Sequence, residues 1–155
     1  MLSLYKPEID DLWFRQKLLA DSETMSYNSD WGGTILFPKE KWTDWYNYWI
    51  DGKENMQYYR YLLNTAINEF VGEVSYHYDI SRKIYICSII IHNKHRRKGY
   101  GEEGLRLLCE AAKSNGIITL FDDISSKNPS VKLFLNNGFK IDYATDEIVM
   151  VKKSL

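Results

Sequence analysis

The stretch IIIHNKHRRKGYGEEG, residues 89–104, decides the fold of this chain. An apolar run leads into a polar, basic loop, and a helical pattern follows that opens with two close glycines. The first N–H groups of a helix lack an acceptor within it and lie at the positive end of its dipole, which favours an anion. Gly99 and Gly101 let a phosphate approach the backbone, and the three basic residues 96–98 add positive charge.

Two known patterns fit this junction. Gly99, Gly101 and Gly104 match G-x-G-x-x-G, with an aspartate about 20 residues further on, as in a dinucleotide-binding βαβ unit. In such a unit the glycines follow the strand almost directly, whereas here a polar loop intervenes and little chain remains for further βαβ units. The alternative pattern is R-x-x-G-x-G, formed by Arg96 and the first two glycines.

The second pattern resembles the pyrophosphate loop of the GNAT (Gcn5-related) N-acetyltransferase family. A further segment, NPSVKLFLNNGF at residues 128–139, resembles the other signature of that family, a helix that ends in a Gly-Phe pair. The resemblance covers nearly the whole chain in the order of its elements, and its sequence-specific part lies within residues 89–139. It implies an enzyme that transfers an acetyl group from acetyl-CoA to an amine.

The resemblance also implies a fold class. We expect an α/β (α+β) protein with a mixed, mostly antiparallel sheet, two central parallel strands that splay apart at about 83–92 and 117–124, and helices on both faces. A length of 155 residues suits one domain, 1–155. From residue patterns the remaining expected strands cover 2–5, 57–64, 69–78, 139–143 and 147–152, and the expected helices begin at Pro7, Pro38, Gly101 and Asn128.

An aromatic stripe marks the helix that begins at Pro38. Trp42, Trp45, Tyr46 and Trp49 recur at i, i+3, i+4 and i+7, so they share one helix face. Core packing is the favoured explanation, and the stripe still permits a substrate with an apolar body.

Composition limits the classes of partner. The chain is 45% hydrophobic with net charge −1, so it lacks the global basic field of a nucleic-acid-binding protein. Without a signal peptide or an apolar run long enough to span a bilayer, we expect a soluble cytoplasmic protein that binds no membrane. Cys87 and Cys109 read as free buried thiols, and the three histidines form no metal site. The oligomeric state stays open, with a homodimer as one alternative.

The family resemblance assigns the donor and acceptor sites. Backbone groups of Ile89 and Ile91 are expected to bind the pantetheine arm, and amides in the loop to bind the pyrophosphate. The expected acetyl-CoA-binding residues are Ile89, Ile91, Arg96, Arg97, Lys98, Gly99, Tyr100, Gly101, Glu102, Asn128 and Phe134. The expected contacts of the amine substrate, a small molecule or a peptide, are Tyr27, Asn28, Asp30 and Trp31.

Acetyl transfer to an amine needs a neutral amine, a polarised thioester carbonyl and a proton for the departing thiolate. Backbone N–H groups near Ile91 could polarise the carbonyl in the manner of an oxyanion hole. The candidate bases are Glu73, Asp122 and Asp123, acting directly or through water.

The chain departs from the family pattern at two positions. Phe134 stands where many members carry a tyrosine that protonates the thiolate, so the alternatives are Tyr76, Tyr85, Tyr100 or water. Asn128 lies one position closer to the Gly-Phe pair than the usual asparagine and is a candidate helix cap. Loss of the tyrosine favours, as a rival function, a module that binds acyl-CoA without turning it over, and a dinucleotide-dependent oxidoreductase is the third alternative.

Overall fold

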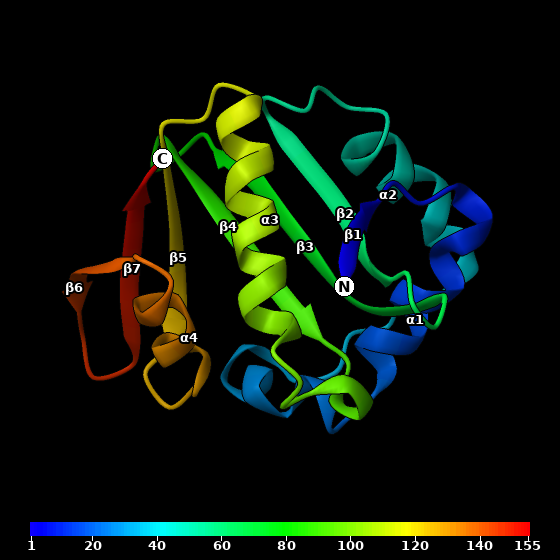
Figure 1. Ribbon diagram of the computed structural model, residues 1–155, viewed down its shortest axis with the longest axis horizontal. Coiled ribbons are helices and arrows are strands. Elements are labelled where there is room, and N and C mark those ends of the chain that lie inside the picture. The colour runs from blue at the N-terminus through cyan, green and yellow to red at the C-terminus, as the bar shows by residue number, and fades with distance from the viewer.

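A computed structural model gives the backbone of residues 1–155 and describes the side chains of residues 1–28 and 32–155. It contains a seven-stranded sheet in the order β1-β2-β3-β4-β5-β7-β6. Helices flank this sheet (Figure 1). The strands are β1 (Leu2–Tyr5), β2 (Gln57–Asn64), β3 (Glu69–Asp79), β4 (Ile84–Ile91), β5 (Thr119–Ser125), β6 (Lys140–Ala144) and β7 (Ile148–Ser154). The α-helices are α1 (Trp13–Ala20), α2 (Trp42–Trp49), α3 (Tyr100–Ser114) and α4 (Ser130–Asn136), and short 3-10 helices are η1 (Ile9–Leu12), η2 (Thr24–Trp31), η3 (Lys39–Lys41) and η4 (Asn93–His95).

The central feature of the sheet is the parting of β4 from β5. These parallel strands are paired only at Tyr85–Leu120 and Ile86–Phe121. Beyond that point β5 keeps its full antiparallel pairing with β7, from Thr119–Ser154 to Ser125–Ile148. The other neighbouring pairs are antiparallel as well. The predicted mixed sheet with two splayed central strands is therefore confirmed.

Two layers of helices cover the two faces of the sheet. On one face α3 and α4 pack over a core that includes Leu105, Leu108 and Phe134 (Figure 1). On the other face α1 and α2 enclose smaller cores that contain Phe14, Leu18 and many aromatic rings. Because strand side chains alternate between faces, successive residues of β3, β4 and β5 contribute to different cores.

The glycines of α3 have separate tasks. Gly99 lies just before the helix with φ +81°, a left-handed conformation that favours glycine. Gly104 lets α3 approach the sheet, because a Cβ there would lie 2.6 Å from a methyl group of Leu62. The helix ends at Ser114, and Gly116 follows with φ +85°.

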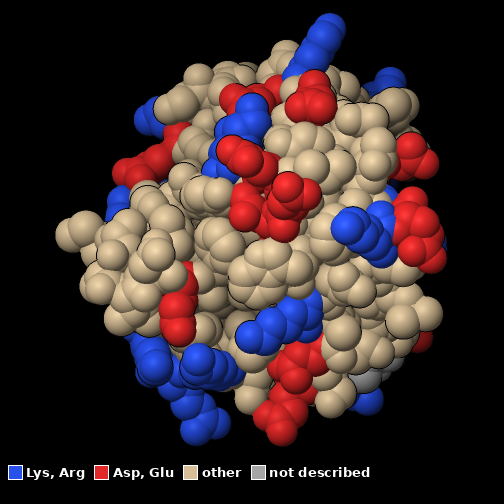
Figure 2. All heavy atoms as spheres, turned by 90° about the vertical axis from the view of Figure 1, so that its right-hand side faces the viewer, with Lys and Arg blue, Asp and Glu red and all other residues tan. Residues whose placement is uncertain are grey.

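Element boundaries differ from the sequence expectations by a few residues. The helix expected to begin at Pro7 starts as the 3-10 turn η1 and becomes α-helical only at Trp13. No helix among the residues that the structure describes is long and apolar enough to cross a membrane. The face in Figure 2 carries acidic and basic side chains in mixed groups, which agrees with the small net charge.

Gly72 fixes the spacing between β3 and β4. A Cβ at this position would lie 2.3 Å from the backbone oxygen of Ile90, so the strands would have to move apart. We expect Gly72→Ala to lower the free energy of unfolding by about 2–3 kcal/mol, as overpacking against a backbone atom does. Urea denaturation measures this change. Glu69→Ala, an exposed change on the same strand, should stay within about 0.5 kcal/mol, and equal effects would contradict the close approach.

Candidate active site

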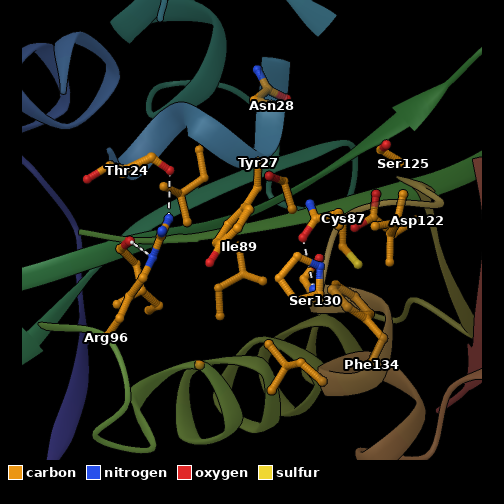
Figure 3. A pocket seen from close by; sticks show the side chains of 18 of the residues that line it. Thr24, Tyr27, Asn28, Cys87, Ile89, Arg96, Asp122, Ser125, Ser130 and Phe134 are labelled. Carbon is orange, nitrogen blue, oxygen red and sulfur yellow. Dashed lines mark hydrogen bonds between the residues drawn. The ribbon is translucent and has the colours of Figure 1, made fainter. Parts of the chain in front are cut away.

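The parted strands form one wall of a cavity of about 680 Å³. It runs between β4 and β5 and is closed by η2, the start of α3 and α4 (Figure 3). Figure 3 shows Arg96 at one end and Cys87, Asp122 and Phe134 grouped at the other. The cavity therefore joins the basic loop to the point where the strands separate.

Backbone groups of β4 line this cavity. In an antiparallel pair the N–H and C=O groups of one residue point to the same side, and those of the next residue point to the other. The oxygen of Ile90 faces β3, and the N–H of His92 donates to Val71 on β3. The backbone groups of Cys87, Ile89 and Ile91 consequently point the opposite way, toward the gap. Because β5 does not pair with β4 beyond Ile86, this edge can bind an extended ligand.

The start of α3 presents N–H groups to the same cavity. Gly99, Tyr100 and Gly101 all line it, and the N–H groups of the first helical turn have no acceptor within the helix. Arg97, with φ +64°, and Lys98 are exposed next to these amides. The buried Nδ1 atom of His95, which also lines the cavity, has no hydrogen-bond partner among the described side chains. Free amides, positive charge and glycines without side chains together suit a polyphosphate.

Arg96 has a second role that the sequence did not indicate. Its guanidinium donates to three backbone oxygens, at 3.2 Å to Ile91, 2.6 Å to Thr24 and 3.4 Å to Glu23. It also stacks 4.6 Å from the ring centroid of Tyr27. Arg96 thus ties η2 to the end of β4, and burial lowers its pKa from the usual range.

Asp122 and Asp123 point to opposite faces of β5. Asp123 accepts a hydrogen bond from Arg82 at 3.3 Å near the protein surface. Asp122 lies between the buried residues Leu120 and Ile124, on the face of Cys87 (Figure 3). Burial, and then the charge of Asp123, raises the pKa of the Asp122 carboxyl well above its usual range. Asp122 is therefore neutral over a wider pH range than an ordinary aspartate.

Glu73 belongs to a second cavity of about 270 Å³ on the other side of β4. Arg15 donates through Nη1 to Oε1 and Oε2 of Glu73 at 2.8 and 3.2 Å. The hydroxyl of Tyr59 donates to Oε1 at 2.6 Å. The two cavities share lining residues from β4 and η2, namely Met25, Asn28, Ile86, Cys87, Ser88 and Ile90. A molecule in each cavity would therefore meet at the separating end of the strands.

The tyrosines considered as proton donors are engaged elsewhere. Tyr76 donates to the backbone oxygen of Glu54, and Tyr85 donates to that of Asn55. Tyr100 lines the larger cavity, but its hydroxyl accepts from Asn64 at 2.6 Å. Burial raises the pKa of Tyr76 to about 12.

The predicted residues of α4 both line the larger cavity. Phe134 is 1% exposed and packs edge-on against Phe139, with ring centroids 4.9 Å apart. Asn128 accepts through its side-chain oxygen from the N–H of Ser130 at 2.8 Å, which caps the start of the helix. The Cys87 thiol is buried, and burial raises its pKa well above the usual value, which argues against a nucleophilic role.

The predicted substrate contacts are divided. Tyr27 lines the larger cavity and stacks on Arg96, whereas Asn28 lines both cavities. Asp30 and Trp31 lie outside the side chains that the structure describes. Sequence reasoning missed Arg15 and His77, which line the second cavity. Arg15 had no motif around it, and only its contact with Glu73, 58 residues away, reveals it.

Asp122→Asn tests the buried carboxyl without an activity assay. The folded-state pKa of Asp122 lies above its unfolded value, so the wild-type protein loses stability as the pH rises through the interval between them. We expect the variant to match the wild type in thermal midpoint at low pH and to exceed it at neutral and higher pH. Asp123→Asn removes only the second cause of the raised pKa, so it should show a smaller pH-dependent gain. Parallel melting curves for Asp122→Asn and wild type across pH would contradict the assignment.

Comparison with known proteins agrees with this geometry. Residues 18–139 match the model of the Acetyltransferase (GNAT) family. A spermidine N-acetyltransferase from Vibrio cholerae, in complex with CoA and spermine, has a TM-score of 0.79 at 19% identity, with 99% of this chain and 95% of that chain covered. A GNAT-family acetyltransferase from Streptococcus pneumoniae has a TM-score of 0.80 at 18% identity, with 100% of both chains covered. The YncA acetyltransferase from Salmonella typhimurium with acetyl-CoA has a TM-score of 0.78 at 15% identity, with 99% and 94% covered. Together with the parted strands, the match over most of its length means that the chain belongs to the GNAT family of acetyltransferases.

Proposed function

We propose that the protein transfers an acetyl group from acetyl-CoA to a primary amine by direct attack, with both substrates bound together. The observation that carries this proposal is the meeting of two cavities at the unpaired end of β4. One cavity leads to a helix N-terminus beside basic residues, and the other holds a buried carboxylate among aromatic rings. Two similar proteins of known structure contain CoA or acetyl-CoA.

The larger cavity is the proposed donor site. The first-turn amides of α3, from Tyr100 to Glu102, would hold the pyrophosphate, with Arg97 and Lys98 adding charge. The outward-facing backbone groups of Ile89 and Ile91 would hold the pantetheine arm as a neighbouring strand does. Bound in this way, acetyl-CoA supplies an activated acetyl group as a thioester.

Glu73 is the proposed proton acceptor for the amine. Its carboxylate lies in the smaller cavity, and Arg15 keeps it oriented through Nη1. A hydrogen bond from the amine to Glu73, direct or through water, favours the neutral nucleophile. The amine nitrogen then forms a bond to the carbonyl carbon and loses a proton toward the carboxylate. Orientation of the two substrates across β4 provides the proximity that the reaction needs.

Asp122 is the proposed proton donor, a change from the basic role considered from sequence. It lines the larger cavity immediately beyond the last paired residues of β4 and β5. Because its pKa is raised, the carboxyl keeps its proton to a higher pH than an ordinary aspartate does. When the carbon–sulfur bond breaks, this proton would move to the thiolate, a task for which Phe134 has no hydroxyl. Asp123 also lines this cavity, but its carboxylate is paired with Arg82, and its charge helps to raise the pKa of Asp122.

A non-catalytic acyl-CoA-binding module is the alternative. The side chain of Phe134 and the engaged hydroxyls of Tyr76, Tyr85 and Tyr100 favour it. Steady release of CoA from acetyl-CoA in the presence of an amine excludes that module. Binding of acetyl-CoA without CoA release from any amine would instead support it.

Gly101→Val tests the donor site. A Cβ at this position would lie 3.1 Å from a methyl group of Leu133 and would narrow the cavity beside the helix amides. Acetyl-CoA at a hundred times its dissociation constant should stabilise the wild type by about 2.7 kcal/mol. We expect the variant to lose this thermal shift while remaining folded. Glu110→Ala, on the exposed side of α3, should retain the thermal shift. Normal acetyl-CoA binding by Gly101→Val would show that the pyrophosphate binds elsewhere.

Asp122→Asn also tests the proton donor. General-acid catalysis typically contributes about 10²- to 10⁴-fold, so kcat should fall within that range while the acetyl-CoA thermal shift persists. In the wild type the rate should decline as the pH rises and Asp122 ionises, and this decline should vanish in the variant. Asp123→Asn removes a charge that raises the pKa of Asp122, so it should retain the maximal rate and shift the decline to lower pH. Unchanged kcat in Asp122→Asn would remove Asp122 from the mechanism.

A further inference from the structure

The smaller cavity has walls that suit an apolar group. Trp45 and Trp49 stand next to each other with ring centroids 6.3 Å apart and an interplanar angle of 29°. Tyr59 meets Trp45 edge-on at 4.7 Å. Leu19, Ile35 and Ile90 add aliphatic side chains to the walls, and polar side chains come from Asn28, Ser75, His77 and Ser88. A volume of about 270 Å³ admits a small molecule, and its apolar lining favours a body without polar groups.

The charges of this cavity cancel. Among the described residues that line it, Arg15 and Glu73 are the charged pair, and each is mostly buried, with side chains 16% and 6% exposed. Arg15 lies over the rings of Trp45, at 4.5 Å, and Phe37, at 5.0 Å, so its position is fixed by packing as well as by the ion pair. Burial lowers the pKa of His77, with a contribution from Arg82 and against the effects of Asp79 and Asp123, which disfavours a charge on His77.

One acceptor atom remains for a ligand. Oε1 of Glu73 accepts two short hydrogen bonds, from Arg15 and from Tyr59. The contact recorded for Oε2 is the longer one, at 3.2 Å to Arg15. A carboxylate oxygen has room for further donors, so Oε2 can accept a hydrogen bond from one amine. The cavity thus offers a carboxylate anchor next to aromatic rings.

This arrangement discriminates by charge. A second ammonium group on the ligand would be buried without an opposite charge, because the single carboxylate is already paired with Arg15. A carboxylate on the ligand would meet the negative charge of Glu73, with which Arg15 is already paired. An uncharged aromatic or aliphatic group would instead replace water against the tryptophan rings.

We propose that the acceptor is a primary monoamine with an aromatic or other apolar body, its nitrogen held by Oε2 of Glu73 and its body packed against Trp45 and Trp49. The proposal rests on the proposed acetyltransferase function and narrows its substrate. It sets this protein apart from the similar Vibrio cholerae enzyme, whose structure contains spermine.

The first experiment compares 2-phenylethylamine, spermidine and phenylalanine as acceptors in a CoA-release assay on the full chain. We expect kcat/KM for 2-phenylethylamine to exceed that of the other two by at least tenfold. A preference for spermidine or phenylalanine would overturn the proposed substrate class while leaving the acetyltransferase function intact. If none of the three amines releases CoA while acetyl-CoA still binds, the result counts against both the acetyltransferase function and the proposed substrate. In that case, quenching of tryptophan fluorescence by 2-phenylethylamine alone would still support the proposed class of ligand for the cavity. Absence of this quenching would reject that class.

Two variants locate the effect in the cavity. Trp49→Ala should raise KM for 2-phenylethylamine at least tenfold and leave KM for acetyl-CoA unchanged. Trp13→Ala, which changes a half-exposed tryptophan on α1 outside the cavity, should leave both constants unchanged. Equal effects of the two variants on the amine KM would reject the aromatic enclosure.

Arg15→Gln tests the balance of charge. Removing the guanidinium leaves Glu73 as the unbalanced charge of the described lining, so the ratio of kcat/KM for spermidine to that for 2-phenylethylamine should rise at least tenfold. The acetyl-CoA thermal shift reports whether the variant is folded. If Arg15→Gln is not folded, Arg15→Lys is tested in its place. Because lysine retains the positive charge, the ratio of the two kcat/KM values should then stay unchanged. A constant ratio in folded Arg15→Gln, or a raised ratio in Arg15→Lys, would contradict the charge argument.

Discussion

The site depends on the parting of β4 and β5, which pair at only two successive positions before they separate. A strand inside a sheet has its backbone groups satisfied on both edges, and an unpaired edge is a template for another extended chain. Here β5 remains paired to β7 along its whole length, so the gap opens on the β4 side without weakening the rest of the sheet. The same opening connects the two faces, and a donor and an acceptor can therefore approach each other through the sheet.

Because side chains alternate along a strand, the two faces of the sheet carry different functional groups beside this opening. Asp122 and Asp123 are adjacent and chemically identical, yet one lies among apolar side chains and the other beside Arg82 at the surface. Burial raises the pKa of Asp122, which suits this carboxyl to the role of an acid. On β3 the same alternation sends Glu73 to the aromatic cavity and Val74 to the core beneath α3.

Local patterns in the sequence predicted most of the fold. β2 and β1 occupy the expected ranges, and the glycine loop and α3 lie where charge, glycine spacing and periodicity put them. The start of α1 was wrong by several residues, because a 3-10 turn and an α-helix present similar apolar spacing. The family membership confirms the predicted class of enzyme. Which aspartate packs beside Leu120 and Ile124 could not be predicted, since a strand boundary uncertain by one residue exchanges the two faces. Arg15, and the cavity that it lines, depend on contacts between distant segments that no local pattern encodes.

Arg96 links η2 to the end of β4. Its guanidinium donates hydrogen bonds to the backbone oxygens of Glu23, Thr24 and Ile91. The N–H of Asn93 also donates to the Thr24 hydroxyl, at 2.9 Å. The segment held in this way, η2, contributes to both cavities. The proposed donor and amine sites are thus linked through the hydrogen bonds of one cation.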